Sequence, residues 1–328
     1  MGGRRVARVG QESVPDGTGF TPDPMQQLTL FDAPKPATFG RYALKWHARY
    51  CSPPWVTAYT SKVRLGVLRA QVLPALGHLR IEDVTVAELE RVQRDMMQRM
   101  KPASVSHTFR SAIGPVLKQA VLDGLIPAHP MRSLRWPRID PAKPDPYTDA
   151  EVDLLLEWFR RHAPQFEVAV ALVMLAGLRP SEACGLKWGD INKNTVLIER
   201  AVVDGQVTTT KTKRSIRKIS VSKRLGAILR RRRGQADEWV CLHRGRLVRT
   251  QALGCYWMRR ACQDVGVRHR GLYAGRRHAI SAAISDGAEI GHVAAYCGTS
   301  ITRIERHYYR YLGALSDPRE AAKRKHTA

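Results

Sequence analysis

The sequence lacks any long apolar run: no stretch approaches the ~18 consecutive apolar residues that a membrane-spanning helix requires. Arginines occur near the N-terminus, but no apolar stretch follows them, so we expect neither a secretory signal nor a membrane span. The six cysteines contain no CxxC pair and no zinc-like spacing. We therefore expect reduced thiols in a cytoplasmic protein, and no metal site.

Acidic residues are scarce relative to basic ones. The chain of 328 residues has 54 Lys and Arg against 29 Asp and Glu, a net charge of +25. An enzyme that acts on small molecules has no general need for such an excess, whereas a protein that displaces counterions from a phosphate backbone does. The charge therefore predicts a nucleic-acid partner, although a basic protein that binds nucleic acid only incidentally would have the same composition.

Composition divides the chain into four parts. Residues 1–36 are rich in Gly and Pro and cannot bury enough apolar area to offset chain entropy, so we expect a basic, disordered tail. Residues 37–137 have helical periodicity, which predicts a helical domain. Residues 138–146 are rich in proline and predict an extended linker. Residues 147–328 form a second domain.

The first domain is typical of four amphipathic helices, with apolar residues at spacings of three and four. The helices are expected to begin near these residues: Thr38, Thr60, Thr85 and Ser104. Thr85, with Glu88 three residues later, predicts a capping box. Pro74 and Gly77 are expected to end the second helix.

The second domain mixes helices with short strands. It begins with a helix capped by Thr148 and Glu151, and an apolar helix spans about residues 166–177. Patterns of β-branched residues predict strands over 195–198, 206–210 and 215–221. Asp204-Gly205 predicts a hairpin turn, and the rest is helical in pattern. The sequence therefore predicts a mainly α fold with a small antiparallel β-sheet.

Four separated motifs contain residues suited to chemistry at a phosphate. In the first, residues 175–190, Gly177 ends one helix and Pro180 suits the first turn of the next, so Arg179 lies at a helix junction beside Glu182. An arginine fork can bind two phosphate oxygens and stabilise the added charge of a five-coordinate transition state. A surface arginine in a turn would explain this motif if it stood alone.

The second motif places Lys211 and Lys213 in a tight turn between two predicted strands. A lysine at the tip of a rigid hairpin can enter the minor groove and protonate a departing 5′ oxygen. A solvated basic turn explains the same residues.

The third motif, residues 272–278, offers two adjacent arginines. With Arg276 as the functional one, the positions three, four, seven and eight residues later are all apolar, whereas Arg277 would bring serines onto that face. Apolar periodicity therefore favours Arg276 and keeps Arg277 as the alternative.

The fourth motif holds three tyrosines, Tyr308, Tyr309 and Tyr311, shortly after Gly298-Thr299-Ser300. A tyrosine can store the energy of a phosphodiester bond covalently, so that DNA is rejoined without ATP or metal. Because the reference pKa of a phenol is ~10, cations around the phosphate must help it lose its proton at pH 7.

In this order and at these distances, the four motifs resemble those of the tyrosine recombinase (phage integrase) family. The resemblance implies that Tyr308, nine residues after Thr299, is the nucleophile. Arg179 and Arg276 would bind the scissile phosphate. Lys211, which opens the family's Lys-Thr-x-x-Ser-x-Arg motif, would protonate the leaving oxygen.

Two positions depart from the family's usual pattern. Tyr273 stands where most relatives have the histidine of a His-x-x-Arg box, and Thr299 replaces the histidine that usually follows Gly298. Both departures resemble one branch of phage integrases, so they agree with one another. Either hydroxyl could hydrogen-bond a phosphate oxygen, but Thr299 cannot serve as an acid. Glu182 is expected to support Arg179.

The resemblance implies a helical core-binding (SAM-like) domain joined to an α+β tyrosine recombinase catalytic domain. Such a protein acts on double-stranded DNA as a homotetramer, with a directionality factor as a further candidate partner. It recombines specific sites, as the integrase of a mobile element does, through a 3′-phosphotyrosine intermediate and without a cofactor. Two alternatives stay open: a catalytically inactive DNA-binding regulator on the same scaffold, motivated by the absent histidines, and a type IB-like topoisomerase.

Overall fold

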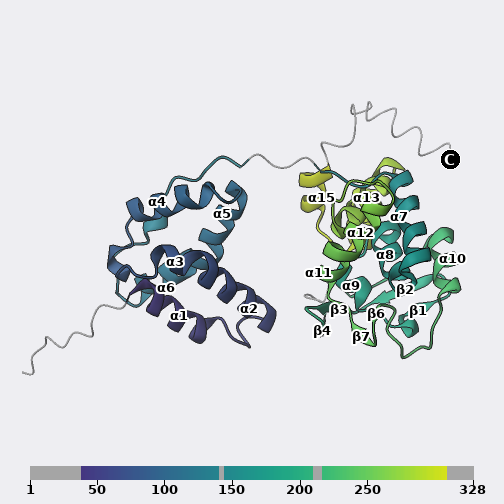
Figure 1. The fold of residues 1–328 in the computed structure, drawn as a ribbon, viewed down its shortest axis with the longest axis horizontal. Coiled ribbons are helices and arrows are strands. Elements are labelled where there is room, and N and C mark those ends of the chain that lie inside the picture. The colour runs from purple at the N-terminus through teal and green to yellow at the C-terminus, as the bar shows by residue number, and fades with distance from the viewer. Residues whose placement is uncertain (1–37, 140–143, 210–215, 309–328) are drawn as a thin grey trace, which may run out of the picture. The chain divides into compact units, whose positions relative to one another are not determined.

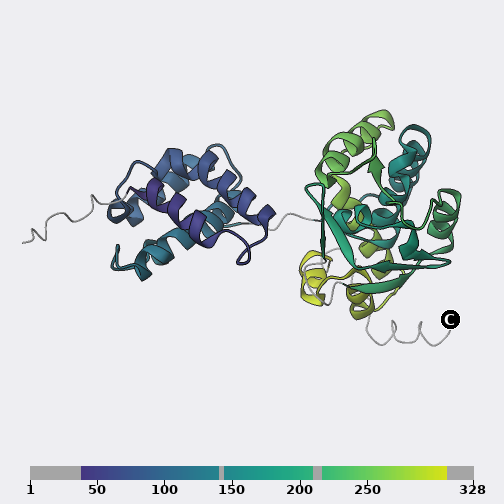
Figure 2. The ribbon, with the colours of Figure 1, turned by 90° about the horizontal axis from the view of Figure 1, so that it is seen from below.

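The structure is a computed structural model that describes residues 38–139, 144–209 and 216–308 (Figure 1). The chain divides into two compact units, residues 1–139 and 140–328. The described part of the first unit is built from helices, and that of the second combines helices with short strands (Figures 1 and 2). The prediction of a mainly α fold with antiparallel pairing is confirmed. None of the described helices is long and apolar enough to cross a membrane.

Within residues 38–139 the helical segments join into four long helices, as predicted. The second and fourth begin slightly earlier than expected, after Thr57 and after Lys101. The segments are α1 (Phe39–Tyr50), α2 (Ala58–Val67), η1 (Leu68–Val72), α3 (Leu73–Leu76), η2 (Ile81–Asp83), α4 (Val86–Met97), α5 (Pro102–Thr108), η3 (Phe109–Ile113), α6 (Gly114–Leu122) and η4 (Pro130–Arg132).

Two of these helices contain a π-helical turn, and each turn comes directly before a proline-containing segment. η1 precedes Pro74, and η3 precedes Pro115. Proline lacks a backbone N–H, and its ring collides with the carbonyl four residues earlier, so a local widening lets the helix continue. The second helix therefore passes through Pro74 and ends at Leu76, and the expectation that Pro74 ends it is wrong.

The core of the first unit lies between these helices. Phe39 of α1, Leu89 of α4 and Phe109 of η3 are fully buried in one apolar cluster. The Thr85 hydroxyl accepts the backbone N–H of Glu88 at 3.3 Å and caps α4, but the Glu88 carboxylate accepts from Arg91, so only half of the predicted capping box forms.

The described part of the second unit contains more elements. Its helices are α7 (Asp149–His162), α8 (Pro164–Ala176), α9 (Pro180–Cys184), η5 (Trp188–Asp190), α10 (Lys223–Arg231), α11 (Thr250–Ala252), η7 (Leu253–Trp257), α12 (Met258–Asp264), α13 (Leu272–Ser285), α14 (Ile290–Cys297) and α15 (Ile301–Tyr308). Its strands are β1 (Ile191–Asn192), β2 (Thr195–Ile198), β3 (Arg200–Val203), β4 (Gln206–Thr209), β5 (Arg217–Ser220), β6 (Leu242–His243) and β7 (Arg246–Leu247).

The described strands form three small antiparallel sheets, β1-β2-β5, β3-β4 and β6-β7. Asp204 and Gly205 both have positive φ (52° and 79°) and close the β3–β4 hairpin, as predicted. β5 pairs with β2, with Val196 opposite Ile219, and not with β4. Lys211 itself lies outside the described residues, but the expectation that the strands on either side of it pair as a hairpin is wrong, because β4 and β5 belong to different sheets.

Helix α8 forms the centre of the second unit, because it is apolar on all sides. Its residues are almost all buried, and it packs against α7, α9, α10 and α13. Gly275 of α13 permits a close approach, since a Cβ there would lie 2.7 Å from Cγ of Met174. A separate apolar cluster, which includes Ile280, Ile284 and Ile304, joins α13, α14 and α15.

Candidate active site

Arg179 lies at the junction between α8 and α9. Gly177 ends α8 with a φ of 64°, a left-handed conformation that glycine adopts without strain, and Pro180 begins α9. The Glu182 carboxylate accepts hydrogen bonds from the Arg179 backbone N–H (3.0 Å) and from its Nη1 (2.6 Å). Nη2 of Arg179 donates to the carbonyl of Gly298. The guanidinium is therefore fixed between α9 and the turn that precedes α15.

The buried Glu182 also binds Arg217 of β5. Nη2 of Arg217 donates to Oε2 at 2.9 Å, Nη1 donates to Oε1 at 3.3 Å, and Nε donates to the Tyr296 carbonyl at 2.8 Å. Burial alone would raise the pKa of the Glu182 carboxyl, but the hydrogen bonds and charges of Arg217 and Arg179 outweigh it and hold the pKa below its usual value. Glu182 thus stays ionised at neutral pH and joins α9 to β5, while its two arginine partners bind carbonyls at the end of α14.

Arg276 reaches the same region from α13. Its side chain is buried, and Nη1 donates to the Gly177 carbonyl at 2.7 Å. Burial, and then the nearby charge of Arg179, lowers the pKa of the guanidinium. An arginine nevertheless stays protonated at neutral pH, so its charge favours an anion close by.

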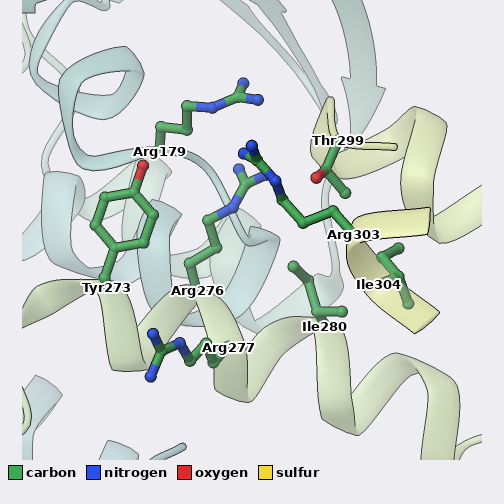
Figure 3. Close-up of a pocket in the computed structure, with 8 residues that line it drawn as sticks. All are labelled: Arg179, Tyr273, Arg276, Arg277, Ile280, Thr299, Arg303 and Ile304. Carbon is green, nitrogen blue, oxygen red and sulfur yellow. The ribbon is translucent and has the colours of Figure 1, made fainter. Parts of the chain in front are cut away.

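Arg179 and Arg276 line a pocket of about 280 Å³ (Figure 3). The Tyr273 hydroxyl points toward Arg179, and Thr299 lies on the opposite side of Arg276 (Figure 3). The other lining residues are Arg277, Ile280, Arg303 and Ile304. Half of the lining side chains are arginines, so the pocket suits an anion such as a phosphate. Among the described residues, no group of His, Cys, Asp or Glu side chains is arranged to hold a metal ion.

The structure separates the two adjacent arginines of α13. Arg276 is 5% exposed and extends into the pocket, whereas Arg277 is exposed and points away from the Arg179 and Arg276 side chains (Figure 3). Ile280 and Ile284, four and eight residues after Arg276, are buried, as the apolar periodicity required. This geometry favours Arg276.

Two predicted site residues have side chains outside the described part of the structure. Lys211 lies within residues 210–215, and Tyr308 is the last residue of α15. The helix that ends at Tyr308 is nevertheless anchored at the pocket, because Ile304 lines it and packs in the cluster that contains Ile280. Thr299 lies just before the start of this helix.

Two arginines of this site were not identified from the sequence. Arg217 ends the Lys-Thr-x-x-Ser-x-Arg pattern, so the pattern itself was the available signal. Arg303 belongs to none of the motifs, and the available signal was its position on the helix that leads to Tyr308.

Comparisons with known sequences agree with this description. Residues 39–136 match the family model of the phage integrase central domain. The ICEBs1 integrase of Bacillus subtilis (strain 168) is 25% identical over 166 residues, which are 48% of this chain and 45% of that protein. The match thus spans less than half of the length of this relative.

Solved integrase structures share the fold. The Tn1549 transposon integrase in complex with a circular intermediate DNA superposes with a TM-score of 0.71 at 16% identity, over 89% of this chain and 100% of that one. A lambda integrase dimer bound to a COC′ core site gives 0.69 at 16% identity, over 86% and 79% of the two chains. A lambda integrase tetramer bound to a Holliday junction gives 0.68 at 16% identity, over 87% and 80%.

The described residues therefore combine the fold of solved integrases with an arginine-lined pocket. The chain is thus similar in part of its sequence and in its fold to integrases, which agrees with the family resemblance of its four motifs.

Proposed function

We propose that this chain is a site-specific DNA recombinase that cleaves and rejoins DNA through a 3′-phosphotyrosine intermediate. The observation that carries the proposal is the pair of guanidinium groups, Arg179 and Arg276, held by hydrogen bonds at one pocket beside the helix that ends at Tyr308. Donors fixed in advance around a phosphate stabilise the charge that develops in the transition state.

In the proposed reaction, the phenol oxygen of Tyr308 attacks the phosphorus atom and loses its proton to solvent. The bond from phosphorus to the 5′ oxygen breaks, and the ammonium group of Lys211 gives this oxygen a proton. The products are a 3′-phosphotyrosine and a free 5′-hydroxyl. Attack by a 5′-hydroxyl on the phosphotyrosine reverses the chemistry, so strands are rejoined without a cofactor or a metal.

The other residues of the site have supporting roles in this proposal. The hydroxyl groups of Tyr273 and Thr299 hydrogen-bond the phosphate, and Glu182 orients Arg179. Arg276, rather than Arg277, is the second phosphate-binding arginine, because the Arg276 guanidinium lies near the charge of Arg179, whereas the Arg277 side chain points away (Figure 3).

The proposed partner is double-stranded DNA, and the proposed assembly is a homotetramer. The net charge of +25 and the DNA complexes of the structurally similar integrases support this partner. The lambda integrase tetramer on a Holliday junction supports the assembly. Residues 37–137 act as the core-binding domain and 147–328 as the catalytic domain, joined by the linker 138–146. The reaction takes place in the cytoplasm of the host cell.

A nicked suicide substrate tests this function. Its duplex carries a site selected by binding from a random library, and the short strand released on cleavage diffuses away, so the covalent complex accumulates. The unaltered chain should form a protein–DNA adduct that survives denaturation. Tyr308→Phe should form none, while Tyr309→Phe should keep it. Adduct formation by Tyr308→Phe would show that another tyrosine is the nucleophile.

The same experiment separates the alternatives. Site-specific binding without any adduct would indicate a catalytically inactive regulator. Relaxation of plasmids that lack the selected site would indicate a topoisomerase.

Paired substitutions test the choice between the two arginines of α13. Arg276→Ala should slow cleavage by roughly 10²–10³-fold, the usual effect of losing one donor to a transition-state anion. Arg277→Ala should slow it by much less. The reverse order would exchange the two roles.

A further inference from the structure

A third arginine reaches the pocket from the helix that ends at Tyr308. Arg303 lies in α15, four residues after Thr299, and lines the pocket together with Arg179 and Arg276. Figure 3 shows its side chain extending from α15 into the pocket, from the side where Thr299 lies. Three arginines, from the junction before α9, from α13 and from α15, therefore line one space.

Among the described residues, only one of these three arginines has a carboxylate partner. Arg179 has a carboxylate partner in Glu182, but in the described part of the chain neither Arg276 nor Arg303 forms an ion pair. Neighbouring like charges repel one another, so this arrangement is favourable when an anion lies between them. The pocket therefore has more positive charge than its two predicted phosphate-binding arginines supply.

We propose that Arg303 is a third phosphate-binding arginine of this site. The inference rests on the proposed recombinase function and extends it. Tyr273 and Thr299, which flank the pocket, offer neutral hydroxyl groups and add no positive charge. Arg303 adds a charge that persists at every physiological pH, because a guanidinium is not deprotonated in proteins. For the same reason Arg303 is not the acid that protonates the leaving oxygen.

The position of Arg303 also links phosphate binding to the nucleophile. Arg303 and Tyr308 are both in α15, and Tyr308 lies five positions further along, about 7–8 Å along the helix axis. A phosphate held by Arg303 therefore fixes the helix that carries the attacking group. Arg303, which binds the phosphate, and Tyr308, which attacks it, would therefore shift together as parts of one helix.

The experiment measures single-turnover cleavage of the suicide substrate by Arg303→Ala at saturating protein. A second substrate has a methylphosphonate at the scissile position, so that a neutral methyl group replaces one charged oxygen. Arg303→Ala should slow cleavage of the phosphate by roughly 10²-fold and of the methylphosphonate by less than about tenfold, because less charge has to be neutralised. Arg161→Ala is the matched control, since Arg161 pairs with the exposed Glu157 outside the pocket.

Arg303→His adds a readout that a merely structural role would not move. An imidazole has a reference pKa of ~6.5, so this variant is charged at pH 6 and neutral at pH 8. Its cleavage rate relative to the unaltered chain should fall as the pH rises between these values. The corresponding ratio for Arg161→His should stay constant.

Three results would overturn the inference: rapid cleavage of the phosphate by Arg303→Ala, equal slowing on both substrates, or a flat pH ratio for Arg303→His. If the unaltered chain forms no adduct, the proposed function fails. The affinity for the selected duplex then tests whether Arg303 binds phosphate. Arg303→Ala should weaken this binding more than Arg161→Ala does. Equal weakening would overturn the inference.

Discussion

Glu182→Gln tests whether one buried carboxylate holds the arginine side of the pocket together. The substitution keeps the size of the side chain and removes its charge. Arg179 and Arg217 would then both face a neutral amide, although Glu182 now binds them at 2.6 and 2.9 Å. We expect lower stability of the second unit and, because Arg179 loses an anchor, slower DNA cleavage.

The magnitude follows from the burial of the three side chains. Removing one partner of a buried ion pair costs about 3–5 kcal/mol, because a buried charge is left without compensation. The side chains of Glu182 and Arg217 are 3% and 9% exposed, but that of Arg179 is 27% exposed, so water solvates it in part. We therefore expect a loss of about 3 kcal/mol in the free energy of unfolding. For a unit of this size, such a loss lowers the Tm by roughly 6–12 °C.

The effect depends on pH with a definite sign. The folded-state pKa of Glu182 is below its unfolded value of ~4.3, so the folded state binds fewer protons. The ionised carboxylate stabilises the folded state fully when the pH is above the unfolded-state pKa of ~4.3. This stabilisation is lost as the pH falls toward the folded-state pKa. The difference in Tm between the unaltered chain and Glu182→Gln should therefore narrow below about pH 4.

Scanning calorimetry of the full chain measures both effects, with Glu157→Gln as the matched control. Hydrogen bonds from Arg160 and Arg161 lower the pKa of Glu157 to about 2, but this cluster is exposed at the surface of α7. Exposed ion pairs contribute little because water and salt screen them. Glu157→Gln should leave the Tm nearly unchanged. Equal shifts for the two variants would refute the reasoning, because burial would then make no difference.

Three glycine substitutions test the packing around the site, each by the Tm of the full chain. Gly298→Ala should cost about 1–2 kcal/mol or more, because Gly298 has a φ of 64° and a Cβ there would lie 2.8 Å from Nη1 of Arg217; it should also slow cleavage. Gly275→Ala should cost about 1–3 kcal/mol, since its Cβ would lie 2.7 Å from Cγ of Met174; an unchanged Tm would show that α8 and α13 can separate freely. Gly66 is in an exposed helical position, where an added Cβ would meet no other part of the protein within 4 Å. Gly66→Ala should therefore stabilise the chain by about 0.5–1 kcal/mol.

Local features of the chain could be predicted because their causes lie within a few residues. Thr148 and Glu151 form the expected capping box at the start of α7, with hydrogen bonds of 2.8 and 3.3 Å. Asp204-Gly205 closes the expected hairpin. The mostly apolar segment of residues 166–177 predicted the buried helix α8. The spacing of four motifs likewise sufficed to indicate the family.

The strand pairing around residues 210–215 could not be predicted from local sequence. Strand patterns identify residues that fit a pleated, half-buried surface, but they do not indicate which other strand pairs with them. β5 pairs with β2 across an intervening hairpin, so the choice depends on the whole sheet.

Propensity, capping and apolar periodicity act over short distances, so they were enough to predict the helices, the hairpin turn and two of the pocket's arginines. Which arginines share a pocket depends on how the helices pack. Arg179 donates to Gly298, 119 residues away, Arg276 donates to Gly177, 99 residues away, and Arg303 lies beside them without belonging to any motif. Such contacts form when helices pack, because packing brings together residues that are far apart in the chain. Packing also removes their charges from water.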